Sequence, residues 1–308
     1  MTTTSSPTAD SQPALAPFNM TPAEIAGLDK IVAAAAADAE VHTTPCGDGS
    51  LVWRRWGPPG RSARPVVLAH GGSGSWTHWF KTIPALKQRY EVWAVDLPGL
   101  GDSAMPSQPL TPESSGKAFA ECIRRLIPAA RRPHVTAFSF GAHVSSFALL
   151  ELQEWVAGFT ITGCAALGLP QGPGIPFPRE DASMSGAEAL GVHRRLLEIL
   201  MFHNPARIDA LAIHLQAGNV RKARFRSPPF ARTPQIAENL PKIRVPVSAL
   251  WGGNDQTAWP TIEARYDVLR SGHHELITRT VPDAGHWVMY EQADGYNAAL
   301  TDLIEGTR

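Results

Sequence analysis

The sequence of 308 residues predicts an α/β fold, with a mostly parallel, twisted sheet, flanking helices and an inserted helical lid. Three observations support this prediction. Short apolar runs alternate with helical patterns, glycine-rich turns follow several of these runs, and the alternation stops between residues 167 and 244. Alternation of this kind is typical of a parallel sheet covered by helices. With 44% hydrophobic residues, the chain is long enough to bury the core of one such domain.

The apolar runs have the length and composition of strands. They occupy residues 51–56, 65–69, 91–95, 132–138, 158–165, 245–251 and 276–281. Helical patterns lie at residues 76–88, 112–126 and 142–155. An earlier helix is expected to begin at Thr21, because threonine is a good N-cap and Pro22 would take the first helical position.

The chain divides into three parts by composition and pattern. Residues 1–17 are rich in Thr, Ser, Pro and Ala, and we expect a disordered N-terminal tail. Residues 18–168 and 243–308 form the predicted α/β core. Residues 169–242 open on a loop rich in glycine and proline, continue with helical patterns, and are predicted to form the lid.

Charge and cysteine content narrow the class of partner. The 28 basic and 28 acidic residues balance and form no block of like charge, so neither nucleic acid nor a membrane surface is an expected partner. No stretch approaches the roughly 20 apolar residues of a membrane span. Cys46, Cys122 and Cys164 suit neither a disulfide framework nor a zinc site. We expect a cytoplasmic protein that acts on small molecules, and the sequence does not indicate its oligomeric state.

Ser139 is the candidate nucleophile. It lies in the stretch AFSFGA, between a predicted strand and a predicted helix. A sharp strand-to-helix turn lifts the side chain out of the sheet, and the helix N-terminus favours developing negative charge. The usual pattern is G-x-S-x-G, and Ala137 stands at the first glycine position. Alanine is tolerable there because it is the next smallest side chain where strand and helix pack closely.

Two candidate partners follow in the order Ser, Asp, His. Asp255 ends the stretch WGGND after one predicted strand, and His286 lies in PDAGHW after the last one. Chemistry gathers beyond the carboxyl ends of parallel strands, so these side chains can converge on Ser139. Asp283 is a rival acid, but it stands only three residues before His286 and would have to turn back on its own loop.

The three residue types suit nucleophilic catalysis. A serine hydroxyl is a poor nucleophile at neutral pH, so His286 would accept its proton and return it to the leaving group, while Asp255 would orient the imidazole. The developing oxyanion needs preorganised donors, and we expect the backbone N–H groups of Gly72 and Phe140 to supply them. His70, before the oxyanion glycines, is expected to be a structural turn residue. No metal or organic cofactor is needed for this chemistry.

Four ordered motifs together resemble the α/β-hydrolases of the serine type, from about residue 43 to the C-terminus. They are the elbow at Ser139, the HGG loop at residues 70–72, DLPGLGDS at residues 96–103 and the acid loop at residues 251–255. The resemblance implies that Asp96 fixes a turn and takes no part in catalysis. It also implies a helical lid inserted after the strand that follows the elbow helix.

A serine at the elbow attacks an acyl carbon, so hydrolysis of a carboxylic ester or lactone is the leading hypothesis. The stretches at residues 201–206 and 285–287 are also similar to the carbon–carbon bond hydrolases that cleave ring-fission (meta-cleavage) products. Those enzymes usually carry Asn before the nucleophile, and this chain has Phe138. A ligand receptor with vestigial hydrolysis is a third hypothesis. Acyl transfer to an acceptor other than water is compatible with the same acyl-enzyme.

The substrate pocket is expected to be apolar and partly aromatic. Its candidate residues flank the motifs or lie in the lid, and they are Ser73, Trp76, Phe138, Trp287, His193 and Arg194. For the two tryptophans, packing in the core is the alternative. The basic lid residues could clamp a substrate carboxylate through bidentate hydrogen bonds, or form a solvated helix face.

Overall fold

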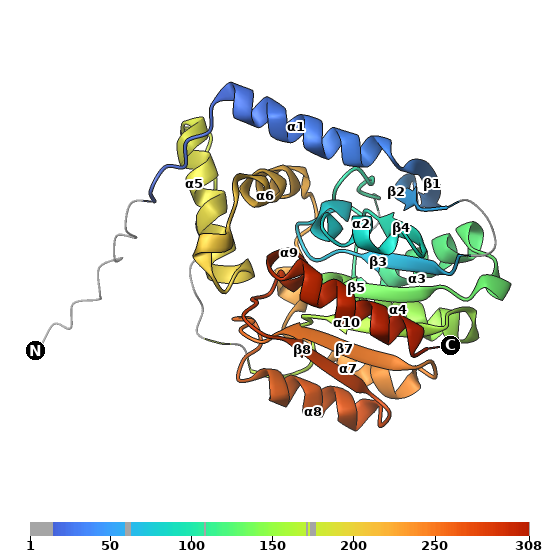
Figure 1. The fold of residues 1–308 in the computed structure, drawn as a ribbon. Helices are drawn as coiled ribbons and strands as arrows, with labels where there is room; N and C mark the ends of the chain where they lie inside the picture. Colours follow the sequence, from blue (N-terminus) through green and yellow to red (C-terminus); the bar gives the residue numbers. More distant parts are fainter. Residues whose placement is uncertain (1–14, 59–62, 108, 171, 173–176, 308) are drawn as a thin grey trace, which may run out of the picture.

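The computed structural model describes residues 15–58, 63–107, 109–170, 172 and 177–307. Most of the predicted N-terminal tail, residues 1–14, lies outside the described residues. The described chain forms one eight-stranded sheet with helices on both faces (Figure 1). Its strands are β1 (Glu40–Cys46), β2 (Gly49–Trp56), β3 (Pro65–Ala69), β4 (Glu91–Val95), β5 (His134–Phe138), β6 (Gly158–Thr162), β7 (Val247–Gly252) and β8 (Ile277–Val281).

The strand order is β1-β2-β4-β3-β5-β6-β7-β8. The β1–β2 and β2–β4 pairs are antiparallel, and all later pairs are parallel. The predicted mostly parallel sheet is therefore confirmed. Every residue of β3, β4, β5, β6 and β7 is buried, as expected for strands covered on both faces.

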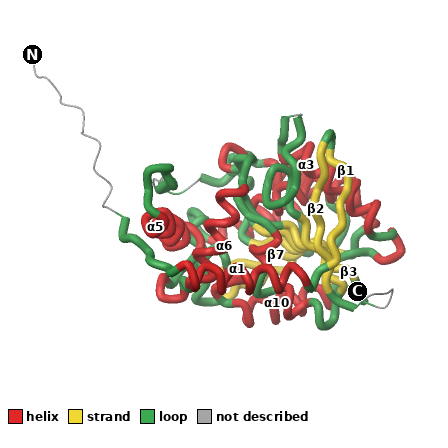
Figure 2. Tube along the Cα trace, turned by 90° about the horizontal axis from the view of Figure 1, so that it is seen from above, coloured by secondary structure: helices red, strands yellow, loops and turns green. Residues whose placement is uncertain are grey.

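Two hydrophobic clusters hold the helices against the two faces of the sheet. On one face lie α3 (Pro112–Leu126), α4 (Phe140–Leu152), α7 (Gln235–Asn239) and α8 (Ile262–Gly272). On the other face lie α2 (Ile83–Leu86), α9 (Val288–Glu291) and α10 (Ala293–Glu305). The pattern in the sequence did not predict β1, α8 or α10. The tube view along the sheet shows the strands between these helical layers (Figure 2).

The predicted helix at residues 76–88 is not continuous. A short 3-10 turn, Trp76–Trp79, begins after Ser75, whose side chain accepts a hydrogen bond from the N–H of Thr77. Helix α2 starts only at Ile83. Pro84 lies at its first turn, where the missing N–H is harmless, but a proline there could not continue a helix from the preceding turn.

The segment predicted to form the lid contains α5 (Gly186–Leu196) and α6 (Ala210–Lys222), which lie beyond the carboxyl ends of the parallel strands (Figure 1). Its last helix, α7, packs against α4 of the core, and Gln235 accepts a hydrogen bond from the ring of His143 at 2.7 Å. None of the helices in the described ranges has both the length and the apolar composition needed to cross a bilayer.

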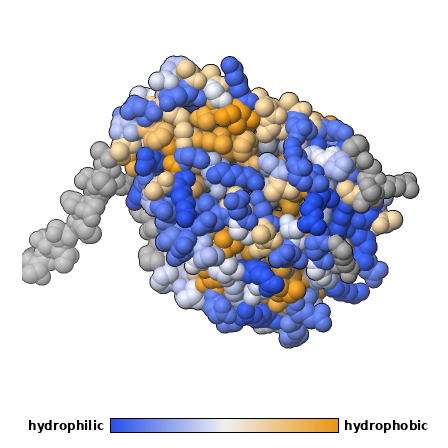
Figure 3. Space-filling model, in the orientation of Figure 1, coloured by the Kyte–Doolittle hydropathy of each residue, from blue (hydrophilic) through white to orange (hydrophobic). Residues whose placement is uncertain are grey.

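Helix α1 (Pro22–Ala37) runs across the top of the molecule and reaches from the lid to the antiparallel end of the sheet (Figure 1). It begins as predicted at Thr21, which forms a capping box with Glu24. The surface over this region is mainly apolar (Figure 3). None of the α1 residues is fully buried, so the helix lies on the core without packing deeply into it.

Candidate active site

Ser139 lies at a sharp turn between β5, which ends at Phe138, and α4, which begins at Phe140. Its backbone has φ 51 and ψ −115, a conformation that a non-glycine residue adopts only under constraint. The Ser139 N–H donates to the carbonyl of Thr162 at 2.8 Å, which fixes the turn to β6. Gly141 is required because a Cβ there would lie 2.5 Å from the carbonyl oxygen of Ala69.

The structure brings Ser139, His286 and Asp255 together. The imidazole Nε2 of His286 lies 3.1 Å from Ser139 Oγ, and its Nδ1 lies 2.8 Å from Asp255 Oδ2. Asp255 and His286 are each 6% exposed, whereas Ser139 is half-buried. This chain of hydrogen bonds can move a proton from the serine to the imidazole while the carboxylate holds the ring.

Thr257 is a further partner of the carboxylate that the sequence did not indicate. Its backbone N–H and its hydroxyl both donate to Asp255 Oδ1 at 2.8 Å. Burial of the Asp255 carboxyl raises its pKa, but the charge and hydrogen bond of His286 and the hydrogen bonds from Thr257 outweigh burial. The pKa therefore lies below its usual value. The carboxylate is held ionised where it faces the imidazole.

Gly72 and Phe140, the predicted oxyanion residues, lie side by side. A Cβ on Gly72 would be 3.7 Å from Phe140 Cβ. The structure describes no hydrogen bond from either N–H in the part of the chain that it covers. The N–H of Gly71, in contrast, donates to His78 Nδ1 at 3.2 Å. In this loop the geometry therefore favours Gly72 over Gly71 as an oxyanion donor.

His78 supports both the loop and the imidazole, and no motif pointed to it. It is 2% exposed, and burial together with the neighbouring imidazoles holds its pKa well below the usual value. A neutral ring can accept the hydrogen bond from Gly71. Its ring also contacts Phe138 with centroids 5.4 Å apart, and Phe138 in turn contacts the His286 ring at 4.8 Å.

Glu291 joins the His286 loop to the lid. Its carboxylate accepts hydrogen bonds from the N–H groups of Gly285 at 2.7 Å, His203 at 2.9 Å and Asn204 at 2.7 Å. In addition, the N–H of Trp287 donates to the carbonyl of Met201 at 2.8 Å. The sequence contained no signal for Glu291, because its three partners come from two segments about 80 residues apart.

Of the candidate pocket residues, Phe138 lies beside the imidazole of His286. Ser73 follows Gly72 in the loop after β3, where it is half-buried and has a φ of 50°. The two tryptophans pack into the core. Trp76 contacts the ring of Trp56 at 5.4 Å, and Trp287 is fully buried with its Nε1–H donating to the carbonyl of His78. Trp287 therefore fills the core, whereas Trp76 packs into the core and also lines a cleft beneath α1.

The two basic lid candidates have partners within the lid or near it. His193 Nε2 lies 2.8 Å from a Glu180 carboxylate oxygen. Arg194 pairs with Glu198 at 3.1 Å, and its guanidinium lies 5.5 Å from the centre of the Phe18 ring. These contacts engage both side chains, and the structure does not bring them to Ser139.

His70 and Asp96 have structural contacts, as expected. His70 is fully buried, and its Nε2 accepts from the N–H of Leu97 at 2.9 Å. The Asp96 carboxylate accepts from the N–H groups of Trp76 at 2.8 Å and Asp102 at 3.0 Å, which fixes the turn after β4. Among the described residues there is no group of three or more His, Cys, Asp or Glu side chains that could hold a metal ion.

Ser139 lies at the turn after β5, Asp255 follows β7 and His286 follows β8. This arrangement of Ser, Asp and His along the sheet defines an α/β hydrolase. The model of the alpha/beta hydrolase family matches residues 66–299. The chain belongs to this family.

Curated relatives include more than one reaction class. The chain is 22% identical over 281 residues to the 2-hydroxy-6-oxononadienedioate/2-hydroxy-6-oxononatrienedioate hydrolase of Klebsiella pneumoniae subsp. pneumoniae, covering 86% of this chain and 90% of that protein. It is 27% identical over 289 residues to the dihydrolipoyllysine-residue acetyltransferase component of the acetoin cleaving system of Pseudomonas putida, covering 90% of this chain and 71% of that protein.

Solved structures show the same fold. The naproxen esterase of Bacillus subtilis superposes with a TM-score of 0.69 at 17% identity, over 93% of this chain and 99% of that one. A meta-cleavage product hydrolase of Pseudomonas fluorescens IP01 superposes with a TM-score of 0.70 at 17% identity, over 88% of this chain and 100% of that one. Esterases and carbon–carbon bond hydrolases thus share this architecture.

Proposed function

We propose that this hydrolase cleaves a carboxylic ester or lactone through an acyl-enzyme on Ser139. The observation that carries the proposal is the chain of hydrogen bonds from Ser139 through His286 to Asp255, at 3.1 and 2.8 Å. Ser139 Oγ attacks the acyl carbon as its proton passes to His286 Nε2, and the imidazolium then protonates the departing alcohol. Water attacks the acyl-enzyme in the second half, with His286 again as base.

In this mechanism the other residues stabilise charge. Asp255 holds the imidazole in the tautomer that leaves Nε2 free to accept, and stabilises the imidazolium that forms. In this proposal the N–H groups of Gly72 and Phe140 donate to the developing oxyanion, where one donor typically contributes about 2.7–4 kcal/mol to lowering the barrier. The positive end of α4 adds to this stabilisation.

Two features favour an ester over a ring-fission product. Phe138, immediately before the nucleophile, is 1% exposed and offers a ring without donors beside His286. The curated relative from Klebsiella is named for a dioate, which carries two carboxylates. In this lid, Arg194 is paired with Glu198, and Arg221 is paired with Glu180 at 3.0 Å. Cations that already have carboxylate partners suit an uncharged substrate better.

Carbon–carbon bond hydrolysis is the second candidate. It is supported by the relatives named above, and by the contact between the two stretches that resemble those enzymes, where the Trp287 N–H donates to the Met201 carbonyl. Acyl transfer to an acceptor other than water uses the same acyl-enzyme, and a receptor with vestigial hydrolysis would keep the same three residues.

A single panel of substrates tests these alternatives. Steady-state rates are measured for the wild type and Ser139→Ala with p-nitrophenyl esters of graded chain length and with a ring-fission dienoate. Sustained ester turnover that is lost in Ser139→Ala is the expected result. Turnover of the dienoate alone would replace the ester proposal by carbon–carbon bond hydrolysis. A single slow burst without turnover would point to a receptor.

A further inference from the structure

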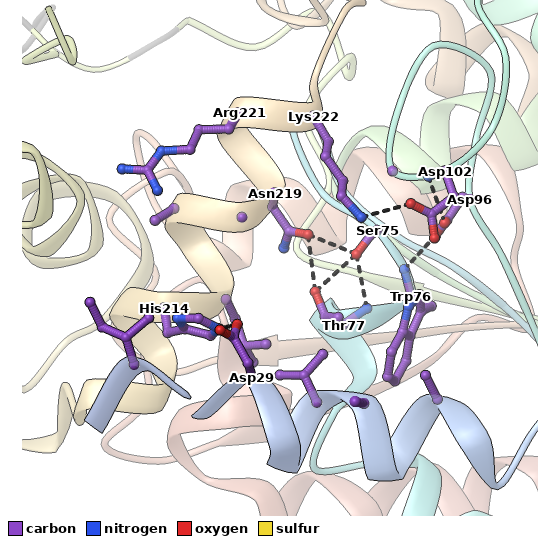
Figure 4. Close-up of a pocket in the computed structure, with 18 of the residues that line it drawn as sticks. Asp29, Ser75, Trp76, Thr77, Asp96, Asp102, His214, Asn219, Arg221 and Lys222 are labelled. Atoms are coloured by element: carbon purple, nitrogen blue, oxygen red, sulfur yellow. Dashed lines mark hydrogen bonds and ion pairs between the residues drawn. The ribbon is translucent and has the colours of Figure 1, made fainter. Parts of the chain in front are cut away.

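A cleft of about 660 Å³ lies between α1, α6 and the turn that starts at Ser75 (Figure 4). Its volume is in the range of small-molecule sites. Ser139, Asp255 and His286 are not among the residues that line it. The cleft is therefore distinct from the candidate active site.

One part of the wall of the cleft is apolar. Helix α1 contributes a stripe at the helical spacing i, i+7, i+8, i+11, made of Ile25, Val32, Ala33 and Ala36. Apolar residues of the lid face this stripe, namely Leu190, Leu215 and Ala217. A stripe of this kind normally packs against a core, yet no residue of α1 is fully buried. Val32 and Ala36 pack in part against the core, and the stripe as a whole also lines the cleft.

Helix α1 is held over this space at several points. Before the helix, the N–H of Phe18 donates to the carbonyl of Ala187 at 2.9 Å. In its middle, Asp29 lies 3.1 Å from His214 of α6 (Figure 4). Near its end, the carbonyl of Ala35 accepts from Trp56 Nε1 at 3.0 Å. These three contacts hold α1 in place above the cleft.

A buried, unsatisfied donor lies on the polar side of the cleft. Asn219 is 3% exposed, and its Oδ1 accepts from the hydroxyls of Ser75 at 2.7 Å and Thr77 at 3.0 Å. Ser75 Oγ itself accepts from the N–H of Thr77, which agrees with its proton going to Asn219. The amide nitrogen has no hydrogen-bond partner among the described residues. It points away from the two hydroxyls, toward the space between α6 and α1 (Figure 4).

The charged side chains that line the cleft are already paired. Lys222 lies 2.7 Å from Asp102, and Arg54 lies 3.2 Å from Asp96. Arg221 is held by Glu180, as described above. A ligand with a net charge would have to displace one of these partners. An uncharged ligand would leave all of them in place, and a carbonyl oxygen would satisfy the amide of Asn219.

We propose that this cleft is a second binding site, for a neutral, mainly apolar small molecule whose carbonyl oxygen accepts a hydrogen bond from Asn219. The apolar part of the ligand lies along the inner stripe of α1. The site does not depend on the reaction proposed for Ser139, because none of the candidate catalytic residues lines it.

Methyl heptyl ketone is a suitable probe, because it has an apolar chain and a carbonyl but no ester bond to be cleaved. Its binding is measured by calorimetry with the full chain, before and after Ser139 is blocked with diethyl p-nitrophenyl phosphate. Two tryptophan variants on α1 form a matched pair. Ala33→Trp fills the cleft, whereas Ala34→Trp adds the same side chain at an exposed position outside the lining.

We expect the ketone to bind the blocked and unblocked protein equally. Ala33→Trp should weaken binding at least about tenfold, and Ala34→Trp should not change it. Asn219→Asp keeps the acceptor for Ser75 and Thr77 but removes the donor, and should also weaken binding about tenfold.

Loss of ketone binding on blocking Ser139, or equal affinities in Ala33→Trp and Ala34→Trp, would overturn the second site. If the protein released no p-nitrophenol from the blocking reagent, Ser139 would not be reactive. That result would count against the proposed function and would leave the proposed cleft site untouched. The comparison of the two tryptophan variants would then decide the question of the cleft.

Discussion

Ser227 Oγ occupies the space beside Gly72, only 2.1 Å from the position that a Cβ atom on Gly72 would take. The same lid segment covers the other predicted oxyanion residue, because the ring of Phe225 packs against Phe140 with centroids 5.4 Å apart. The N–H of Phe225 donates to the carbonyl of Gly99 at 3.2 Å, which anchors the segment to the core. The segment predicted to form the lid and the loop at Gly72 are therefore in direct contact.

Gly72→Ala is expected to reduce kcat/KM for esters by about tenfold to a hundredfold, because the new methyl must displace the Ser227 side chain. Ser227→Gly in the same chain removes the clash and should restore most of the activity. Gly27→Ala, in α1, is the control, since a Cβ there meets no atom within 4 Å. Equal rates for Gly72→Ala and the wild type would contradict the close contact.

Asp255→Asn should lower kcat by about four orders of magnitude, through the wrong imidazole tautomer, with little change in fold. Ser139→Ala should abolish turnover. Both variants are measured with the p-nitrophenyl esters, and circular dichroism serves as the control for folding. Full activity in Ser139→Ala would show that Ser139 is not the nucleophile.

Glu291→Gln should destabilise the protein by about 1–3 kcal/mol, because a carboxamide oxygen cannot replace a carboxylate that accepts three backbone hydrogen bonds. Ester turnover should fall as well, since Gly285 precedes His286. Thermal unfolding and steady-state kinetics check both effects. Glu113→Gln is a suitable control, because among the described residues the Glu113 carboxylate pairs with Lys117 alone, in an exposed i,i+4 pair whose loss should change stability by less than about 0.5 kcal/mol.

His134 should make folding sensitive to acid. Burial, and to a lesser extent the charge of Arg64, lowers the pKa of His134 from 6.5 to about 3. Between pH 6.5 and about 3, His134 binds a proton in the unfolded chain but not in the native protein. The free energy of unfolding therefore decreases as pH falls through this range. In His134→Gln, urea unfolding should show a shallower loss on acidification, by up to about 1.4 kcal/mol per pH unit. Parallel stability curves would contradict this role.

Local sequence was sufficient to predict the strands of the parallel sheet and the turn at Ser139. A buried parallel strand is a continuous apolar run, and the nucleophile turn needs small residues within a few positions of the serine, so both signals are short-range. Each of Ser139, Asp255 and His286 stands just after a predicted strand, and this position was enough to predict that the three side chains converge. The predicted helix at residues 76–88 was interrupted, because Pro84 can begin a helix but cannot continue one.

The sequence by itself therefore determined the class of fold and the residues at the strand ends, because these depend on neighbours in the chain. Only the tertiary structure decided which distant side chains support them. Glu291 contacts the lid, Ser227 contacts Gly72, and Trp76 and Trp287 lie in the core. The cleft beneath α1 likewise depends on where that helix lies against α6, to which Asp29 and His214 tie it. Contacts between segments far apart in the chain depend on packing and leave no periodic pattern in the sequence.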